Sequence, residues 1–407
     1  MMKVLRRSWR LARLAACTAL ALGLAGTAGA VSAPAQARVT APLVQYHLLA
    51  SWGSNASGEL GDGTTISRWQ YGEVRTSNDL TQVAAGLVHA LGVRFDGTVW
   101  AWGLNAWGEL GDGSTTDRSE PVQVAGLTGI TQVAAGAFFS LALRSDGTVW
   151  AWGANQKGQL GRKTVTDREV TPARVAVLNH VTKISAGNDF ALALRADGIV
   201  FAWGHGQSGQ LGNGGTADSP VPVKIAGLAR VTGIAAGSDA SLATENNGVS
   251  AITSVWAWGG NEDGQLGDGT LAGHATPERV TGLPVYVAGL SAGDGFAAVL
   301  GADGSVWDWG ANGIGELGVA PHTPAVTRPV NAIAAGSGIM QLAAGVSHML
   351  ALKSDGTVLS WGWNQSGQLG RDPAGQASAG PGPVTGLAGA TQVSAGWQSS
   401  YAVHTMP

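Results

Sequence analysis

Residues 133–161, VAAGAFFSLALRSDGTVWAWGANQKGQLG, decide the fold of this chain of 407 residues. Leu141 and Leu143 alternate with smaller residues, and residues 149–152 are rich in β-formers, so both segments are typical of strands with a period of two. The pair Asp146-Gly147 between them predicts a hairpin with a type I′ turn, in which both central residues have positive φ. Short strands predicted near 121–124 and 131–135 complete a four-stranded unit.

The chain repeats this stretch at intervals of about 50 residues, a period typical of solenoids and propellers. Trp-Gly recurs seven times, at Trp52, Trp102, Trp152, Trp203, Trp258, Trp309 and Trp361. Ala-Gly also recurs seven times, ending at Gly86, Gly136, Gly187, Gly237, Gly293, Gly345 and Gly396. The tight turn between the two landmarks occurs only six times, at Asp96, Asp146, Asp197, Asn247, Asp303 and Asp355.

The seventh hairpin is therefore divided between the two ends of the chain. The chain opens with a strand leading into Trp52 and ends with a strand after Gly396. A ring explains both ends, because the N- and C-terminal half-blades pair and leave no open sheet edge. We predict an all-β, seven-bladed β-propeller of four-stranded blades, occupying residues 38–407 as a single domain.

The repeated pattern Ala-Ala-Gly, Leu-Ala-Leu, Asp-Gly, Val-Trp-Ala-Trp-Gly, Asn, Gly-Gln-Leu-Gly resembles the regulator of chromosome condensation repeat family. Seven copies cover roughly residues 46–404. The resemblance implies a seven-bladed propeller. It leaves function open, because the family includes nucleotide exchange factors, enzyme inhibitors and binding scaffolds.

The first 37 residues predict a secretory signal peptide. Five basic residues precede an apolar run over 14–26 and then small residues, with cleavage expected after Ala37 and Ala30 as the second choice. The run is too short to span a bilayer. Arg6-Arg7 leaves twin-arginine export open beside an ordinary basic region. Residues 14–17 match a lipoprotein cleavage box by their letters, but most of the apolar run follows Cys17 instead of preceding it, which argues against a lipid anchor.

The composition without this leader narrows the classes of partner. The only cysteine lies in the leader, so no disulfide or cysteine metal site is expected after cleavage. The leader holds five of the 24 basic residues, which leaves 19 against 27 acidic residues and a net charge of −8. This balance disfavours a nucleic acid or an anionic membrane as the partner.

The residue types of catalytic and metal sites are sparse in the repeats. His89 and His348 occupy a position that phenylalanine fills in other repeats, so we interpret both as packing residues. The remaining histidines lack metal-ligand spacing. The GELGDG segments at 58–63 and 108–113 are interpreted as turns, because no helix or alternating carboxylates accompany them. We therefore expect no enzyme activity, no cofactor and no metal site, although a catalytic set assembled in three dimensions stays open.

Two segments depart from the repeat. The fifth hairpin carries about five extra residues at 249–253, and an unusual connection rich in proline and glycine covers 319–341. Loops accept insertions at low cost, so variation without function is the simpler interpretation of both.

Six aromatic residues have no counterpart in most repeats, namely Trp69, Tyr71, Trp107, Phe138, Trp363 and Trp397, and the last four form the predicted binding site. Phe138 and Trp397 follow the Ala-Gly landmark, while Trp107 and Trp363 lie in the loop after Trp-Gly. In a blade of four antiparallel strands these two connections share one face, so all four are expected around one mouth of the channel.

We therefore expect a secreted, monomeric scaffold, without a stable membrane anchor, that binds a protein or another macromolecule through one face of the propeller. One alternative is an enzyme inhibitor resembling the β-lactamase inhibitory propeller. Guanine nucleotide exchange, as in the nuclear founder of the family, is the other, and export argues against it.

Overall fold

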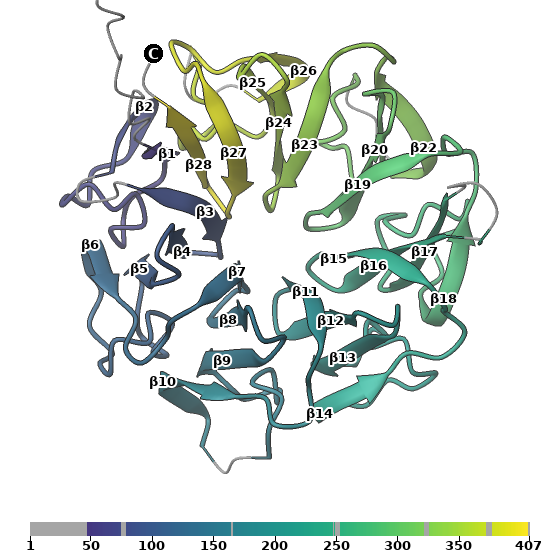
Figure 1. Cartoon of the computed structure of the whole chain (residues 1–407). Helices are drawn as coiled ribbons and strands as arrows, with labels where there is room; N and C mark the ends of the chain where they lie inside the picture. The colour runs from purple at the N-terminus through teal and green to yellow at the C-terminus, as the bar shows by residue number, and fades with distance from the viewer. Residues whose placement is uncertain are drawn as a thin grey trace, which may run out of the picture. The chain divides into compact units, whose positions relative to one another are not determined.

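The structure, a computed structural model, describes residues 47–74, 79–163, 166–246, 248, 253–320, 325–371 and 377–405. The expected signal peptide and residues 249–252 of the long hairpin lie outside these residues. Within them, 28 strands form seven antiparallel sheets of four strands, all in the compact unit Gln45–Pro407. The sheets are the blades of a ring, as predicted (Figure 1).

Six blades are continuous in the chain, and each begins with its innermost strand. The first three are β3 (Leu80–Ala85), β4 (His89–Arg94), β5 (Val99–Gly103) and β6 (Arg118–Gln123); β7 (Ile130–Ala135), β8 (Phe139–Arg144), β9 (Val149–Ala154) and β10 (Arg168–Arg174); and β11 (Val181–Ala186), β12 (Phe190–Arg195), β13 (Val200–Gly204) and β14 (Ser219–Lys224). The next three are β15 (Val231–Ala236), β16 (Ala240–Asn246), β17 (Thr253–Gly259) and β18 (His274–Val280); β19 (Val287–Ala292), β20 (Phe296–Gly301), β21 (Val306–Gly310) and β22 (Val326–Ile333); and β23 (Ile339–Ala344), β24 (His348–Lys353), β25 (Val358–Gly362) and β26 (Ser378–Pro383).

The grouping of strands differs from the predicted unit at one place. The strand expected near 121–124 is β6, which pairs with β5 of the preceding blade and not with β7. The sequence repeat therefore starts one strand before the structural blade. In the same way, the connection predicted over 319–341 contains β22, the fourth strand of its blade.

Both ends of the chain build the seventh blade, as predicted. Its strands are β27 (Ala390–Ala395), β28 (Ser399–Thr405), β1 (His47–Gly53) and β2 (Arg68–Glu73), in that order from the channel outward. β1 and β28 pair in unbroken register from His47↔Thr405 to Gly53↔Ser399. Figure 1 shows the purple N-terminal strands beside the yellow C-terminal ones. This pairing covers the edges that the two half-blades would otherwise expose.

The hairpin turns are not the type I′ turns predicted from Asp-Gly. In the turn after β4, the Arg94 amide donates to the Thr98 carbonyl (2.9 Å) and the Gly97 amide to the Arg94 carbonyl (2.9 Å), which closes a three-residue loop. Only Gly97 has positive φ there (75°). The aspartate keeps an ordinary φ because its carboxylate accepts from the Thr98 amide and hydroxyl, so glycine alone supplies the left-handed residue.

The Trp-Gly tryptophans join each blade to the one before it. All seven are fully buried, and each indole N–H donates to a backbone carbonyl of the preceding blade at 2.7–2.9 Å. The pairs are Trp52 to Gln368, Trp102 to Glu59, Trp152 to Glu109, Trp203 to Gln159, Trp258 to Gln210, Trp309 to Gln265 and Trp361 to Glu316. The first of these pairs crosses the ring closure, so the same contact repeats around the whole ring.

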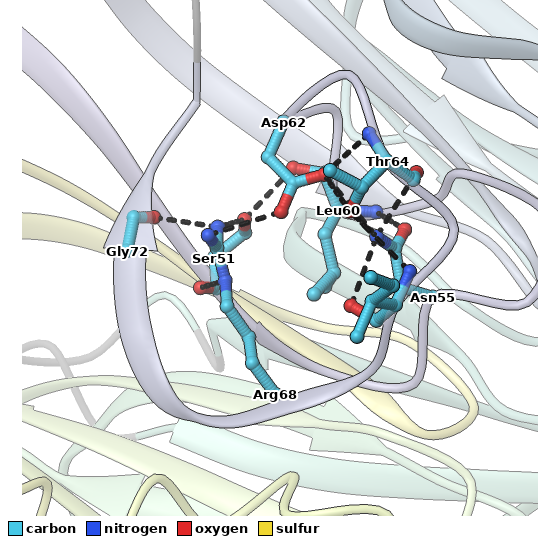
Figure 2. A network of polar contacts seen from close by, with 8 residues as sticks. Ser51, Asn55, Leu60, Asp62, Thr64, Arg68 and Gly72 are labelled. Atoms are coloured by element: carbon cyan, nitrogen blue, oxygen red, sulfur yellow. Dashed lines mark hydrogen bonds and ion pairs between the residues drawn. The ribbon is translucent and has the colours of Figure 1, made fainter.

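A polar network holds the loop that follows the first Trp-Gly (Figure 2). After β1, the Asn55 side-chain oxygen accepts from the Leu60 amide (2.9 Å), and its NH₂ group donates to Asp62 (3.2 Å). Arg68 pairs with Asp62 (3.1 Å) and donates to the hydroxyl of Ser51 (2.8 Å). These bonds replace the missing regular structure and fix the loop on its blade.

Candidate binding face

The connections from the first to the second strand and from the third to the fourth strand of every blade emerge at one edge of the sheets, because neighbouring strands are antiparallel. We call this edge the loop face. At its centre lies the mouth of the channel, a cavity of about 80 Å³ lined by the Ala-Gly segments of all seven blades. The residue after each Ala-Gly glycine also lines it, namely Leu87, Ala137, Asn188, Ser238, Asp294, Val346 and Trp397.

Trp107 is presented on a loop held by the same network as in Figure 2. The Asn105 side-chain oxygen accepts from the Leu110 amide (3.0 Å), and Arg118 pairs with Asp112 (2.8 Å). The Trp107 side chain is half-buried, in contrast to the fully buried tryptophans of the blade cores. A rigid loop therefore displays a large aromatic group that the blade does not need for its own packing.

Phe138, Trp363 and Trp397 lie on the same face as Trp107. Phe138 and Trp397 occupy the short turns that enter β8 and β28, whereas Trp363 follows β25 directly. Phe138 and Trp363 are half-buried, and Trp397 is exposed at 38%. A hydrogen bond joins two of the loops, because the Ser366 hydroxyl donates to the Gln398 side chain (2.9 Å).

The four aromatic residues occupy four consecutive blades of the ring. Trp363 and Trp397 belong to neighbouring blades, and Trp107 and Phe138 belong to the next two. None of them is buried between blades, and Trp397 lines the mouth itself. The structure thus places the predicted site residues on one face. Their role in binding stays a prediction.

Sequence reasoning missed a group of carboxylates on the same face. Asp239, Glu262, Asp263 and Asp294 come from two neighbouring blades, and Asp294 lines the mouth. Partial burial, together with the charges of Asp294 and Glu262, raises the pKa of Asp239, and burial with the same neighbours raises the pKa of Asp263. The sequence signal that could have identified Asp239, Asp263 and Asp294 is their place after an Ala-Gly or Trp-Gly landmark, at positions that hold aromatic residues in other blades.

His89 and His348 are packing residues, as interpreted, and each also makes one hydrogen bond. Their Nε2 atoms lie 3.0 and 2.8 Å from the hydroxyls of Ser140 and Ser400. Each serine donates its proton to a backbone carbonyl, so the histidine Nε2 carries the shared proton. Burial lowers the pKa of both histidines to about 3, so both are neutral at physiological pH.

Two further buried carboxyl groups have oxygens without a hydrogen-bond partner among the residues that the structure describes. One oxygen of the Glu109 carboxylate and both oxygens of Asp308 accept no hydrogen bond. Burial raises the pKa of Glu109 to about 7 and that of Asp308 well above its usual range. Both side chains are fully buried, so we interpret them as local strain on the fold and not as catalytic groups.

Two kinds of feature are absent from the described residues. No set of three or more histidine, cysteine, aspartate or glutamate side chains is arranged there to hold a metal ion. The same part of the chain contains no helix long and apolar enough to cross a membrane.

Comparison with known proteins identifies relatives over nearly the whole ring. The family model for the RCC1-like domain matches residues 48–320 and 128–406. Among solved structures, yeast RCC1 (Prp20) bound to Kap60 superposes with a TM-score of 0.80 and 26% identity, over 89% of this chain and 90% of that one. Human WBSCR16 shares the fold, with a TM-score of 0.78 and 24% identity over 88% and 98% of the two chains.

Curated relatives match over about half of this chain. Human HERC6, a probable E3 ubiquitin-protein ligase, is 33% identical over 47% of this chain and 19% of its own length. The mitochondrial RCC1 domain-containing protein RUG3 of Arabidopsis thaliana is 33% identical over 46% of this chain and 43% of its own. The chain therefore spans less than half the length of these relatives.

Proposed function

This chain belongs to the RCC1-like domain family, and we propose that it is an exported scaffold that binds a protein partner through the loop face. The observation that carries the proposal is the set of four aromatic side chains, none of them buried, on the loop face of four consecutive blades, with Trp397 lining the channel mouth. The repeat's own packing does not require these residues. The basic and apolar leader of the sequence supports export.

Physical chemistry favours a protein as the ligand of such a surface. Tryptophan and phenylalanine supply large contact areas at low cost in side-chain entropy, and binding hot spots are enriched in aromatic residues. Two similar solved structures support a protein ligand. One is yeast RCC1 (Prp20) bound to Kap60, and the other is yeast Prp20p, reported together with its binding to Gsp1p and histones. The acidic charge of this chain disfavours nucleic acid.

A matched pair of tryptophan variants tests the proposal. Trp107→Ala removes a half-buried side chain from the loop face, so we expect it to weaken partner binding by about 2 kcal/mol while the melting temperature stays almost unchanged. Trp152→Ala removes a fully buried side chain and its bond to the preceding blade, so it should lower the melting temperature.

The immobilised wild-type chain captures the partner from the culture medium of the organism that produces this chain. The captured partner is identified by mass spectrometry, and its affinity is then measured for the wild type and for both variants. The variants Trp363→Ala and Trp397→Ala are measured in the same way. If all three tryptophan variants of the loop face bind the partner normally, the interface does not include these residues and lies elsewhere. The opposite face, with the hairpin insertion, would then be the next candidate.

A further inference from the structure

The residues that line the mouth of the loop face fall into two chemically different halves. The residue after the Ala-Gly glycine is apolar in four consecutive blades and polar in the other three. We name the four blades from β23 round the closure to β10 the aromatic half, and the three blades from β11 to β22 the acidic half. The mouth residues of the aromatic half are Leu87, Ala137, Val346 and Trp397, and those of the acidic half are Asn188, Ser238 and Asp294.

At two other positions of the loop face, an aromatic residue of the aromatic half corresponds to a carboxylate of the acidic half. Phe138 in the aromatic half corresponds to Asp189 and Asp239 in the acidic half, each two residues after its Ala-Gly glycine. Trp107 corresponds to Asp263, each five residues after the Trp-Gly tryptophan. The remaining blades carry other residues at these positions, among them Lys157 in the aromatic half and Ile314 in the acidic half. The aromatic and the acidic residues are therefore alternative occupants of equivalent positions. The asymmetry arises from the sequence and not from the fold.

The carboxylates of the acidic half form a connected surface that reaches the mouth. Asp239 accepts from the Gln265 side chain (3.3 Å), and a Cβ added at Gly295, in the next blade, would collide with the carboxylate of Asp263. Asp294 is exposed and lines the cavity that Trp397 also lines. The loop-face connections of these three blades contain no lysine or arginine. Lys157 of the adjoining blade pairs with Asp218 (3.8 Å) and also acts on Asp189, whereas the charged neighbours of Asp239 and Asp263 are carboxylates.

We propose that the partner docks with a protein segment in which a lysine or arginine lies next to an apolar side chain, the cation on the acidic half and the apolar group on the aromatic half. This inference rests on the proposed function and adds the chemistry of the partner.

Charge complementarity makes the loop face selective for a partner with a basic side chain. A cation over the acidic half gains Coulomb attraction from several carboxylates in a partly desolvated surface. Its stem and the neighbouring apolar residue cover Trp397 and Phe138, where an arginine can also stack on an indole ring. A partner with a carboxylate in that place would be repelled, so the division orients the segment as well as holding it.

Peptide selection tests the inference before the natural partner is identified. A phage library of random peptides is selected on the immobilised wild-type chain, and an enriched peptide is synthesised with a fluorescent label. Its affinity is measured by anisotropy for wild type, for Trp397→Ala, and for the triple variant Asp239→Asn, Asp263→Asn, Asp294→Asn. Glu278→Gln is the control, because Glu278 is an exposed carboxylate of the same acidic half on the outer strand β18.

We expect enriched peptides to carry lysine or arginine next to an apolar residue. The triple variant should bind the peptide about tenfold more weakly at low salt, with a smaller loss at high salt, and Glu278→Gln should bind normally. Peptides without a basic residue, or equal binding by the triple variant, would overturn the inference. If Trp397→Ala still abolished binding in that case, the proposed function would stand. Peptides indifferent to Trp397→Ala, or no enrichment at all, would count against both.

Discussion

Replacing Glu109 with glutamine should stabilise the propeller by an amount that grows with pH. Glu109 is fully buried, one carboxylate oxygen accepts no hydrogen bond from the described residues, and burial raises its pKa from 4.5 to about 7. Glutamine already occupies the equivalent position at Gln159, where its side-chain oxygen accepts from the backbone amide two residues earlier, as one oxygen of Glu109 does. The variant therefore keeps the loop bond and removes the buried charge.

The size of the effect follows from linkage between protonation and folding. The folded-state pKa of Glu109 lies above its unfolded value, so its stabilising contribution is complete below about pH 4.5 and is lost as the pH rises through 7. A shift of about 2.5 pKa units corresponds to about 3.4 kcal/mol at high pH. At pH 5 only about 0.8 kcal/mol of this is lost, so the advantage of Glu109→Gln should grow by about 2.5 kcal/mol between pH 5 and pH 9.

Urea denaturation of both proteins at the two pH values measures the difference. The control is Glu59→Gln, because Glu59 occupies the same position and one of its oxygens accepts from the Ser54 hydroxyl (2.9 Å) while the other accepts from the Ser57 amide (2.8 Å). A pH-independent gain, or an equal gain for the control, would refute the reasoning that a buried, half-satisfied carboxylate strains this blade.

Substitutions at three other positions test further features of the ring. His89→Phe should change the free energy of unfolding by less than about 1.5 kcal/mol, because Phe139 fills the equivalent site, whereas His89→Ala should lower it by about 3 kcal/mol. His89→Phe should also reduce the loss of stability between pH 6.5 and 3, which melting curves across that range measure. His180→Gly should gain about 1 kcal/mol, because His180 is exposed and has φ 53°, and His180→Ala should gain nothing in the same denaturation assay. Asp308→Ala should raise the melting temperature at pH 8 by removing a buried carboxyl without partners, and an unchanged or lower value would show that the carboxyl is satisfied.

The repeat pattern predicted the architecture because each landmark has a fixed structural role. The tryptophan that precedes glycine is buried in every blade and bonds to the blade before it, and the unequal counts of landmarks and turns predicted closure between Trp52 and the C-terminal strand. Turn type was predicted wrongly, because Asp-Gly is compatible with both a two-residue and a three-residue loop. The bond from the Arg94 amide to the Thr98 carbonyl selects the longer one.

The sequence predicted the aromatic residues of the candidate site but not its carboxylates. Aromatic residues that break a repeat are visible in the sequence, but their exposure depends on how the loops pack, as for Trp397 at 38%. The carboxylates escaped notice because Asp239 and Asp294 are 55 residues apart and meet only when neighbouring blades close the ring. The hydrogen bond between His89 and Ser140 crosses blades in the same way.

The central claim is that the partner binds at the mouth of the loop face, and site-specific photo-crosslinking tests it most directly. A photoreactive phenylalanine analogue is placed at Trp397, on the loop face, or at Ser145, an exposed residue in a hairpin of the opposite face. The chain is then illuminated in the presence of proteins from the source culture. Binding at the mouth predicts a protein adduct from position 397 and none from position 145. An adduct from position 145 alone would contradict the claim.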